Sequence, residues 1–501
     1  MNAVLLPLVL LPLQPAADAS PPVGLNLSGV RDYASEFPFI DVFRSARTWV
    51  AQRDGGKWGS GEPLDLRPDG YPARLKPGQF ATAILLNAPG YPTGTYTLRF
   101  DGQGRFELNG DAEVTSKSSG RWEVAIGPNP NFLLHVRETD PADPLRNFRL
   151  YMPGFEGDGE AGTATFAPAF VDRCRRFACL RFMDWGETNN SEIATWDDRP
   201  KVDDFSWSSH GVPIETMCEL SNEAATDAWF CVPHLADDDY VRRMAETIRD
   251  TLDAPRRVYI EHSNEVWNGQ FAQARYAGDT GQKRGLSDNR YQAQLRYHAK
   301  RSGEIFAIFD DVLGEDRVVC VLGAQSVNPW TTEQVVSDPS VTARADAVAI
   351  APYFGGRLGD PKTAAEVARM SNDELAERCR ESIRENAAAI AKTKTICDAH
   401  GLDLIAYEAG QHLVGRQGSE NNEALTAAFH RLNRDAAMKT LYVEAYESWA
   451  ENGGGLWCAF ASVARPSKWG SWGLKEYDDQ PDAEAPKWQA IDTILKRAAA
   501  Q

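Results

Sequence analysis

Residues 257–265 read RVYIEHSNE, a short apolar run that ends in histidine, amide and carboxylate side chains. Seven other runs follow the same pattern, in which an apolar stretch leads into a polar loop. Continuous apolar runs are typical of strands buried on both faces of a parallel sheet, and eight such strands close a (β/α)₈ TIM barrel. In chain order, the expected strands are Val42–Val50, Cys179–Trp185, Ala228–Leu235, Arg257–Glu265, Val318–Gln325, Asp346–Tyr353, Leu402–Glu408 and Gly455–Ala461.

Strongly helical sequence fills the intervals between these strands. Residues 237–239 are three aspartates that precede an amphipathic stretch, where acidic side chains suit the positive end of a helix. A glycine follows the helical stretch over residues 372–400 and is a natural helix end. Two more helices are expected over Arg290–Leu313 and Pro486–Ala498. This alternation of strand and helix predicts a parallel array with right-handed crossovers.

One interval is far too long for a βα loop. Residues 51–178 separate the first two expected strands, and residues 66–152 within them lack helical periodicity. They show short alternating strands split by turns such as Pro89-Gly90 and Asn109-Gly110, the pattern of a small β-sandwich. The predicted organisation is therefore a leader over 1–19, the barrel start over 20–65, an inserted β-rich domain over 66–152 and the rest of the barrel over 153–501.

Charge and cysteine content restrict the function. The 501-residue chain has 53 Lys and Arg against 71 Asp and Glu, a formal net charge of −18. A surface this acidic repels phosphate backbones and anionic lipids, so nucleic acid and membrane surfaces are not expected as partners. Eight cysteines without a CxxC pair are too sparse for a disulfide scaffold or a zinc site. Cys174/Cys179 and Cys218/Cys231 are the close pairs that an oxidising compartment could bridge.

The first residues predict that compartment. Met1 to Leu13 form an apolar run too short for a membrane-spanning helix, and Ala17-Asp18-Ala19 supplies a small-x-small cleavage signal. This layout is typical of a secretory signal peptide cleaved after Ala19, although the segment before the apolar run lacks Lys and Arg; a frayed apolar N-terminus or a lipid-anchored tail is the alternative. No later stretch is long and apolar enough for a membrane span, and the chain is expected to be secreted or periplasmic.

Two carboxylates fall where the active site of such a barrel lies. Glu265 ends the fourth expected strand and Glu408 ends the seventh, and active sites of these barrels are built at the carboxyl ends of the strands. The fourth and seventh strands are on roughly opposite sides of the barrel, so their ends can present two side chains across one cleft.

The residues around both carboxylates resemble those of a known group of enzymes. EHSNEVWN at 261–268, with YEAG at 407–410, resembles the retaining glycoside hydrolases of clan A, of the family-5 type. The resemblance implies Glu265 as general acid/base, Glu408 as nucleophile and Asn264 as donor to the sugar 2-hydroxyl. It also implies an aromatic residue on the sixth strand, a tryptophan on the eighth and an early arginine beside the nucleophile. Their candidates are Tyr353, Trp457 and Arg47, with Arg181 as the second choice for the arginine.

Other polar and aromatic residues at strand ends complete the expected substrate site. Histidines there can bond to sugar hydroxyls or serve as buried core groups, and loop aromatics can stack on sugar rings or simply pack the loops down. The candidates are His234, His262, His412, Asp184, Trp185 and Trp267, with Trp207, Trp330, Trp469 and Trp472 as further loop tryptophans. Glu261 shares strand parity with Glu265 and is expected to pair with an arginine inside the barrel. No HExxH-like spacing supports a metal, and no cofactor is predicted.

The implied mechanism requires opposite protonation states of the two carboxyl groups. Glu265 must stay protonated near neutral pH, while an Arg and a Tyr keep Glu408 ionised. The expected partner is a polysaccharide or oligosaccharide, with endo action on a β-glycan favoured by the long loops. An inactive barrel that only binds glycan remains the alternative, whereas an esterase is weakened by the absence of a GxSxG elbow. The insert could bind carbohydrate, form a cleft wall or act as a spacer.

Overall fold

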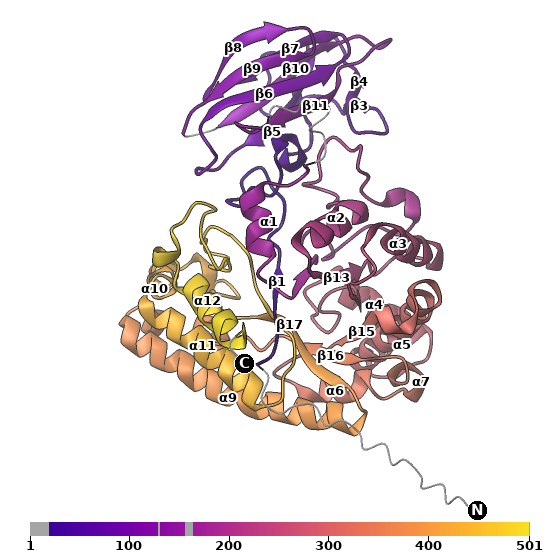
Figure 1. The fold of residues 1–501 in the computed structure, drawn as a ribbon, viewed down its shortest axis with the longest axis vertical. Helices are drawn as coiled ribbons and strands as arrows, with labels where there is room; N and C mark the ends of the chain where they lie inside the picture. The colour runs from indigo at the N-terminus through magenta and orange to yellow at the C-terminus, as the bar shows by residue number, and fades with distance from the viewer. Residues whose placement is uncertain (1–19, 129–130, 156–163, 500–501) are drawn as a thin grey trace, which may run out of the picture.

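The computed structural model describes residues 20–128, 131–155 and 164–499. Eight parallel strands form a closed barrel, which confirms the predicted (β/α)₈ architecture (Figure 1). The predicted signal peptide lies outside the described residues. The barrel strands are β1 (Val23–Asn26), β12 (Cys179–Arg181), β13 (Asp227–Val232), β14 (Val258–His262), β15 (Val318–Gly323), β16 (Ala347–Ile350), β17 (Asp403–Ala409) and β18 (Trp457–Ala459).

The first predicted strand is wrong. Val42–Ser45 form a 3₁₀ turn and Val50 belongs to the inserted domain, whereas the first barrel strand is Val23–Asn26. This strand has only four residues and contains a glycine. It therefore lacks the longer pattern of apolar and β-branched residues that predicted a strand at 42–50. Gly24 has a physical reason to be there, because a Cβ at this position would lie 2.4 Å from the sulfur of Cys458 on the neighbouring β18.

Helices surround the barrel and connect its strands. The four expected helices occur at α3, α5, α9 and α12, and the ends of the last three lie within one residue of those expected. Asp237 caps α3 by accepting a bond from the Tyr240 amide, as the aspartate run predicted. The helices are α1 (Pro168–Cys174), α2 (Ile214–Ala224), α3 (Asp238–Thr251), α4 (Ala272–Lys283), α5 (Arg290–Leu313), α6 (Pro329–Val335), α7 (Pro339–Thr342), α8 (Ala364–Val367), α9 (Asn372–Ala399), α10 (Glu423–Asn433), α11 (Ala436–Glu451) and α12 (Pro486–Ala499).

A β-sandwich is inserted after the first barrel strand and forms a separate lobe at one end of the molecule (Figure 1). It begins at Val50, earlier than the expected residue 66, and its last strand ends at Tyr151. One sheet contains β2 (Val50–Arg53), β5 (Gln79–Leu86), β10 (Phe132–Thr139) and β7 (Gly104–Asn109). The other contains β11 (Arg146–Tyr151), β6 (Gly94–Asp101), β9 (Arg121–Ile126) and β8 (Ala112–Ser118), and a small ribbon pairs β3 (Asp65–Leu66) with β4 (Pro72–Arg74).

The loop after β12 ties the sandwich to the barrel. Phe205 from this loop packs in the sandwich core, where its ring stacks on Trp49 at 5.4 Å. Two residues later, Trp207 packs in the barrel core with its ring 5.0 Å from that of Phe39. Tyr91 and Tyr96 of the sandwich are buried. The loop after β12 therefore contributes one aromatic residue to each of the two cores.

Candidate active site

Glu408 lies on β17 among groups that favour its ionised form. Arg181 of β12 donates from Nη1 to Glu408 Oε1 at 3.0 Å, and the Tyr353 hydroxyl donates to Oε2 at 2.9 Å. The pairing of β17 with β18 shifts between Ala406 and Ala409. A bulge of this kind re-aims side chains, so both Tyr407 and Glu408 reach the interior although strict alternation would send one of them outward.

Glu265 lies beyond the end of its strand, in a strained turn. β14 stops at His262, and both Ser263 (φ 59°) and Glu265 (φ 44°) are in the left-handed region. Asn268 donates from Nδ2 to Glu265 Oε2 at 2.8 Å, and the Tyr407 hydroxyl donates to Oε1 at 3.1 Å. Trp267 in turn donates from its indole nitrogen to the Tyr407 hydroxyl at 3.2 Å. Among the residues that the structure describes, the donors to this carboxyl are both neutral.

The two carboxyl groups therefore differ in their electrostatics. Burial and the nearby charge of Glu408 raise the pKa of Glu265 to about 7, and Asn268 and Tyr407 only partly oppose the shift. Burial also raises the pKa of Glu408, but the guanidinium of Arg181 and the Tyr353 hydroxyl act against that shift. A proton shared by the pair accordingly resides on Glu265, because Glu408 is the partner with a cation in contact.

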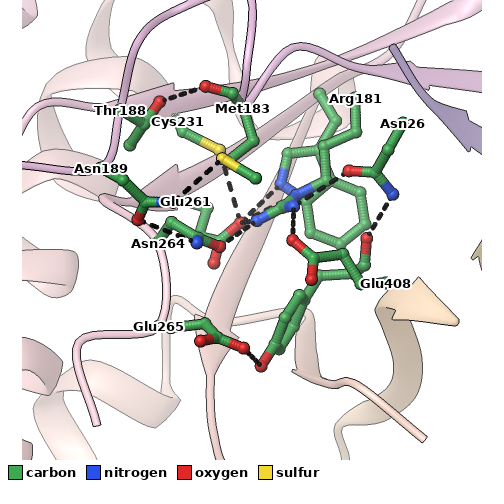
Figure 2. A network of polar contacts seen from close by, with 12 residues as sticks. Asn26, Arg181, Met183, Thr188, Asn189, Cys231, Glu261, Asn264, Glu265 and Glu408 are labelled. Atoms are coloured by element: carbon green, nitrogen blue, oxygen red, sulfur yellow. Dashed lines mark hydrogen bonds and ion pairs between the residues drawn. The ribbon is translucent and has the colours of Figure 1, made fainter. Parts of the chain in front are cut away.

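Arg181 is the centre of a buried polar network (Figure 2). Its Nη2 lies 2.8 Å from Glu261 Oε2, which confirms the predicted pairing of Glu261 with an arginine. The same nitrogen donates to Asn264 Oδ1 at 2.9 Å, while Nη1 donates to Asn26 Oδ1 at 3.1 Å. This many acceptors fix the plane of the guanidinium, and in that plane Nη1 also donates to Glu408. The sequence ranked Arg181 second for this role.

Asn264 is oriented from both sides. Its Oδ1 accepts from Arg181, and its Nδ2 donates to Asn189 Oδ1 at 3.1 Å. Gln273 of α4 holds Asn189 with a 2.7 Å bond and also donates to the Asn264 carbonyl at 2.8 Å. The amide direction of Asn264 is therefore set before any ligand arrives.

An open cleft of about 670 Å³ is lined by the segments that follow β1 and β18, together with Asp184. Asp184, Phe460 and Trp472 line its inner part, where the Trp472 ring lies 5.8 Å from that of Tyr353. Its outer part is lined by Tyr33 and Trp469, whose surfaces are 46% and 60% exposed. Burial and the charge of Glu408 raise the pKa of Asp184 to about 7. The cleft thus offers flat aromatic faces beside the Asp184 carboxyl group.

Known proteins resemble this chain at the level of fold. No family model and no curated protein sequence matches it. Similar solved structures include a GH51 arabinofuranosidase from Xanthomonas axonopodis pv. citri, at 10% identity and TM-score 0.41, with 60% of this chain and 61% of that one covered. A 4-O-α-L-rhamnosyl-β-D-glucuronidase from Fusarium oxysporum 12S matches at 9% identity and TM-score 0.40, over 68% and 66% of the two chains.

A further match is a GH5-4 broad specificity endoglucanase from Bacteroides salanitronis, at 12% identity and TM-score 0.35, over 67% of this chain and 86% of that one. The chain spans less than two thirds of the length of the first two structures.

Two residues expected at the substrate site lie elsewhere. Arg47 forms an ion pair with Asp32 at 2.9 Å in the segment that leads to the sandwich, and Arg181 takes the place expected for it beside Glu408. Trp457 lies outside the barrel wall, where its ring packs against Tyr446 of α11 at 5.8 Å. Its neighbour Cys458 takes the inward position, since the sequence did not define which parity of this three-residue strand faces inward.

Three more candidates are buried away from the cleft. Trp185 is 1% exposed, with its ring stacked on Phe170 at 5.9 Å. His262 follows the inward Glu261, so strand alternation turns it outward onto His298 of α5, at 3.0 Å between the two Nδ1 atoms. His234 faces the Tyr276 ring at 5.5 Å on the same outer side. These residues are core groups, the alternative already recognised for histidines and loop aromatics.

The other candidates contact Glu408, contact residues that bond the two carboxylates, or line the cleft. Tyr353 contacts Glu408, Trp267 contacts Tyr407, and Asp184 lines the cleft. The His412 ring lies 5.4 Å from Tyr353 and 5.1 Å from Trp472. Asn268 and Tyr407 were missed as partners of Glu265, although both lie within the quoted motifs. The described part of the chain has no group of three metal-binding side chains placed to hold an ion, and no helix in it is long and apolar enough to cross a membrane.

All eight cysteines are buried and free, so neither of the two close pairs is bridged.

Two buried histidines, His234 and His298, lead us to expect that the folded protein loses stability in acid. Burial lowers the pKa of His234 and His298 to about 4, so both are neutral in the folded protein at pH 5. The unfolded chain takes up these protons near pH 6.5, and stability is therefore expected to fall as the pH drops from about 6.5 to about 4. Measured across this range, Tm should decline less steeply in His298→Gln than in the wild type. An unchanged slope would contradict the assignment, and His400→Gln, at an exposed position, is the matched control.

Proposed function

We propose that this chain is a retaining glycoside hydrolase that uses Glu408 as nucleophile and Glu265 as general acid/base. The observation that carries the proposal is the unlike setting of two buried carboxyl groups that are close enough for the charge of one to act on the other. Glu408 contacts a guanidinium, and Glu265 has only neutral donors and a pKa raised to about 7. Retaining hydrolysis requires this division into one ionised carboxylate and one protonated acid.

The first step forms a covalent glycosyl-enzyme. A Glu408 oxygen attacks the anomeric carbon as the bond from that carbon to the leaving oxygen breaks, and Glu265 gives its proton to that oxygen. Arg181 and Tyr353 keep Glu408 charged and correctly directed before attack. Asn264 has an amide fixed by Asn189 and Arg181, which suits it to bond the hydroxyl next to the reacting carbon.

The second step restores the enzyme. When Glu408 loses its charge, one cause of the raised pKa of Glu265 is gone. Glu265, which has given up its proton, is then a carboxylate and accepts a proton from an incoming water. That water oxygen bonds to the anomeric carbon while the ester bond to Glu408 breaks. Two displacements leave the sugar with its original configuration. Tyr407 holds one oxygen of Glu265 throughout and receives a bond from Trp267.

The cleft supports a polymeric substrate. It stays open along the side of β1 and β18, and the exposed rings of Tyr33 and Trp469 suit stacking against successive sugars. This shape favours a polysaccharide or oligosaccharide cut internally, and we take a β-glycan as the substrate class. A secreted or periplasmic enzyme would meet such polymers, in line with the expected signal peptide.

Product release from a panel of polysaccharides tests this function. The chain from Ser20 onward should release oligosaccharides, and fast appearance of mixed chain lengths would establish internal cleavage. NMR of the first products should show the anomeric configuration of the substrate. The Glu408→Gln variant should release nothing. Glycan binding by the wild type without any product would instead support the inactive binding barrel.

A further inference from the structure

A buried lysine lies beneath the aromatic wall of the cleft. Lys487 is near the start of α12, is 4% exposed and forms no ion pair within the part of the chain that the structure describes. Its ammonium donates to the carbonyl oxygen of Ser471, which belongs to the loop after β18. A buried charge without a carboxylate in contact costs folding free energy, so its retention calls for a specific role.

The same carbonyl receives a second hydrogen bond. Gln411 donates from Nε2 to the Ser471 oxygen at 2.9 Å, and its own Oε1 accepts from the Leu413 amide at 2.7 Å. Gln411 comes three residues after Glu408 on the chain. One carbonyl oxygen thus joins α12, the loop that follows Glu408 and the loop that follows β18.

The loop held by this carbonyl is built to present Trp472. Gly470 has φ +124°, and a Cβ there would lie 2.4 Å from the Trp472 indole nitrogen. That nitrogen donates to the Trp469 carbonyl at 2.9 Å. The indole then faces His412 and Tyr353, with ring centroids 5.1 Å and 5.8 Å away. Any shift of Ser471 moves the next residue, which is a wall of the cleft.

We propose that Lys487 is a positioning residue for glycan binding, and that it acts by fixing the Ser471 carbonyl and thereby the Trp472 ring. This inference rests on the proposed function, because it assigns the Trp472 wall to a bound sugar. Tyr353, which packs against Trp472, bonds Glu408, so the positioned ring borders the sugar that receives the nucleophile. Burial lowers the pKa of Lys487 to about 7, with the Glu476 carboxylate opposing the shift, which agrees with a costly buried ammonium.

Lys487→Met tests the proposal, because methionine keeps much of the reach but has no donor. We expect KM for an oligosaccharide substrate to rise about tenfold while kcat stays within about threefold, as for a lost binding interaction. Tm should stay equal to that of the wild type or rise, since a costly buried charge has been removed. Lys496→Met, at an exposed position on the same helix, is the matched control and should change neither quantity.

A second comparison separates positioning from a general structural role. In a Trp472→Ala background, Lys487→Met should cause no further rise in KM, because both changes act on one ring. An equal rise in both backgrounds would overturn the proposal, as would an unchanged KM or a fall in Tm that accounts for the lost activity. A wild type that neither cleaves nor binds any glycan would overturn the proposed function, whereas an active wild type with a normal Lys487→Met variant would overturn this inference alone.

Discussion

Glu408→Gln should abolish turnover, with kcat lowered by at least about 10⁴-fold, because an amide oxygen is a far weaker nucleophile than a carboxylate. Glutamine has the same shape, and its oxygen can still accept from Arg181, so the site should keep its geometry. The measurement is kcat on an aryl glycoside whose leaving group needs little protonation. Such a substrate isolates nucleophilic attack from acid catalysis.

A smaller side chain at position 408 gives a second test of Glu408 as the nucleophile. Glu408→Gly opens space beside the anomeric carbon, and added azide should then restore turnover on the aryl glycoside. Azide would displace the leaving group in one step, so the glycosyl azide must have the inverted configuration. Rescue with retained configuration, or full activity in Glu408→Gln, would contradict the nucleophile assignment. Glu138→Gln on the exposed sandwich surface is the control for the substitution itself.

The strands after the insert could be predicted because each combines an apolar run with a polar end. The first strand could not, since Val23–Asn26 is short and its decisive residue is a glycine that lets β18 approach. The start of the sandwich was missed for a related reason. Its strand β2, Val50–Arg53, directly follows a run that reads as a barrel strand. Composition in a window predicts an element, but long-range pairing decides to which sheet it belongs.

The site shows the same division between local pattern and tertiary contact. Glu265, Asn264 and Glu408 could be found because they lie in short recognisable motifs. Trp457 failed because inward and outward positions of a three-residue strand cannot be told apart by sequence. Tyr407 reaches Glu265 because of the irregular pairing between β17 and β18, and the amino-acid types in these strands do not predict that irregularity. Arg181 became central because three acceptors from other strands and loops converge on it.

Glu265→Gln should affect substrates in proportion to their need for a proton. For a natural glycan, whose leaving alcohol is poor, kcat/KM should fall about 10³-fold or more, within the range that general acid catalysis supplies. An aryl glycoside with a good leaving group should form the glycosyl-enzyme almost normally, and its slow hydrolysis should then limit kcat. A burst of released phenol followed by a slow steady state is the expected trace, and azide should accelerate that second phase with retained configuration.

The pH profile gives an independent test of the same residue. Glu265 must be protonated for the first step, and its pKa is raised to about 7, so kcat/KM on a natural glycan should fall as pH rises through about 7. Glutamine does not titrate, and this alkaline limb should therefore disappear in Glu265→Gln while the acidic limb, set by Glu408, remains. Asn268→Ala removes one neutral donor from Glu265 without removing the acid, so it should move the limb rather than erase it. Equal losses of activity on both classes of substrate, or an alkaline limb that survives in Glu265→Gln, would assign the acid to another group. Asp184 would then be the carboxyl to test, because its pKa is also raised to about 7.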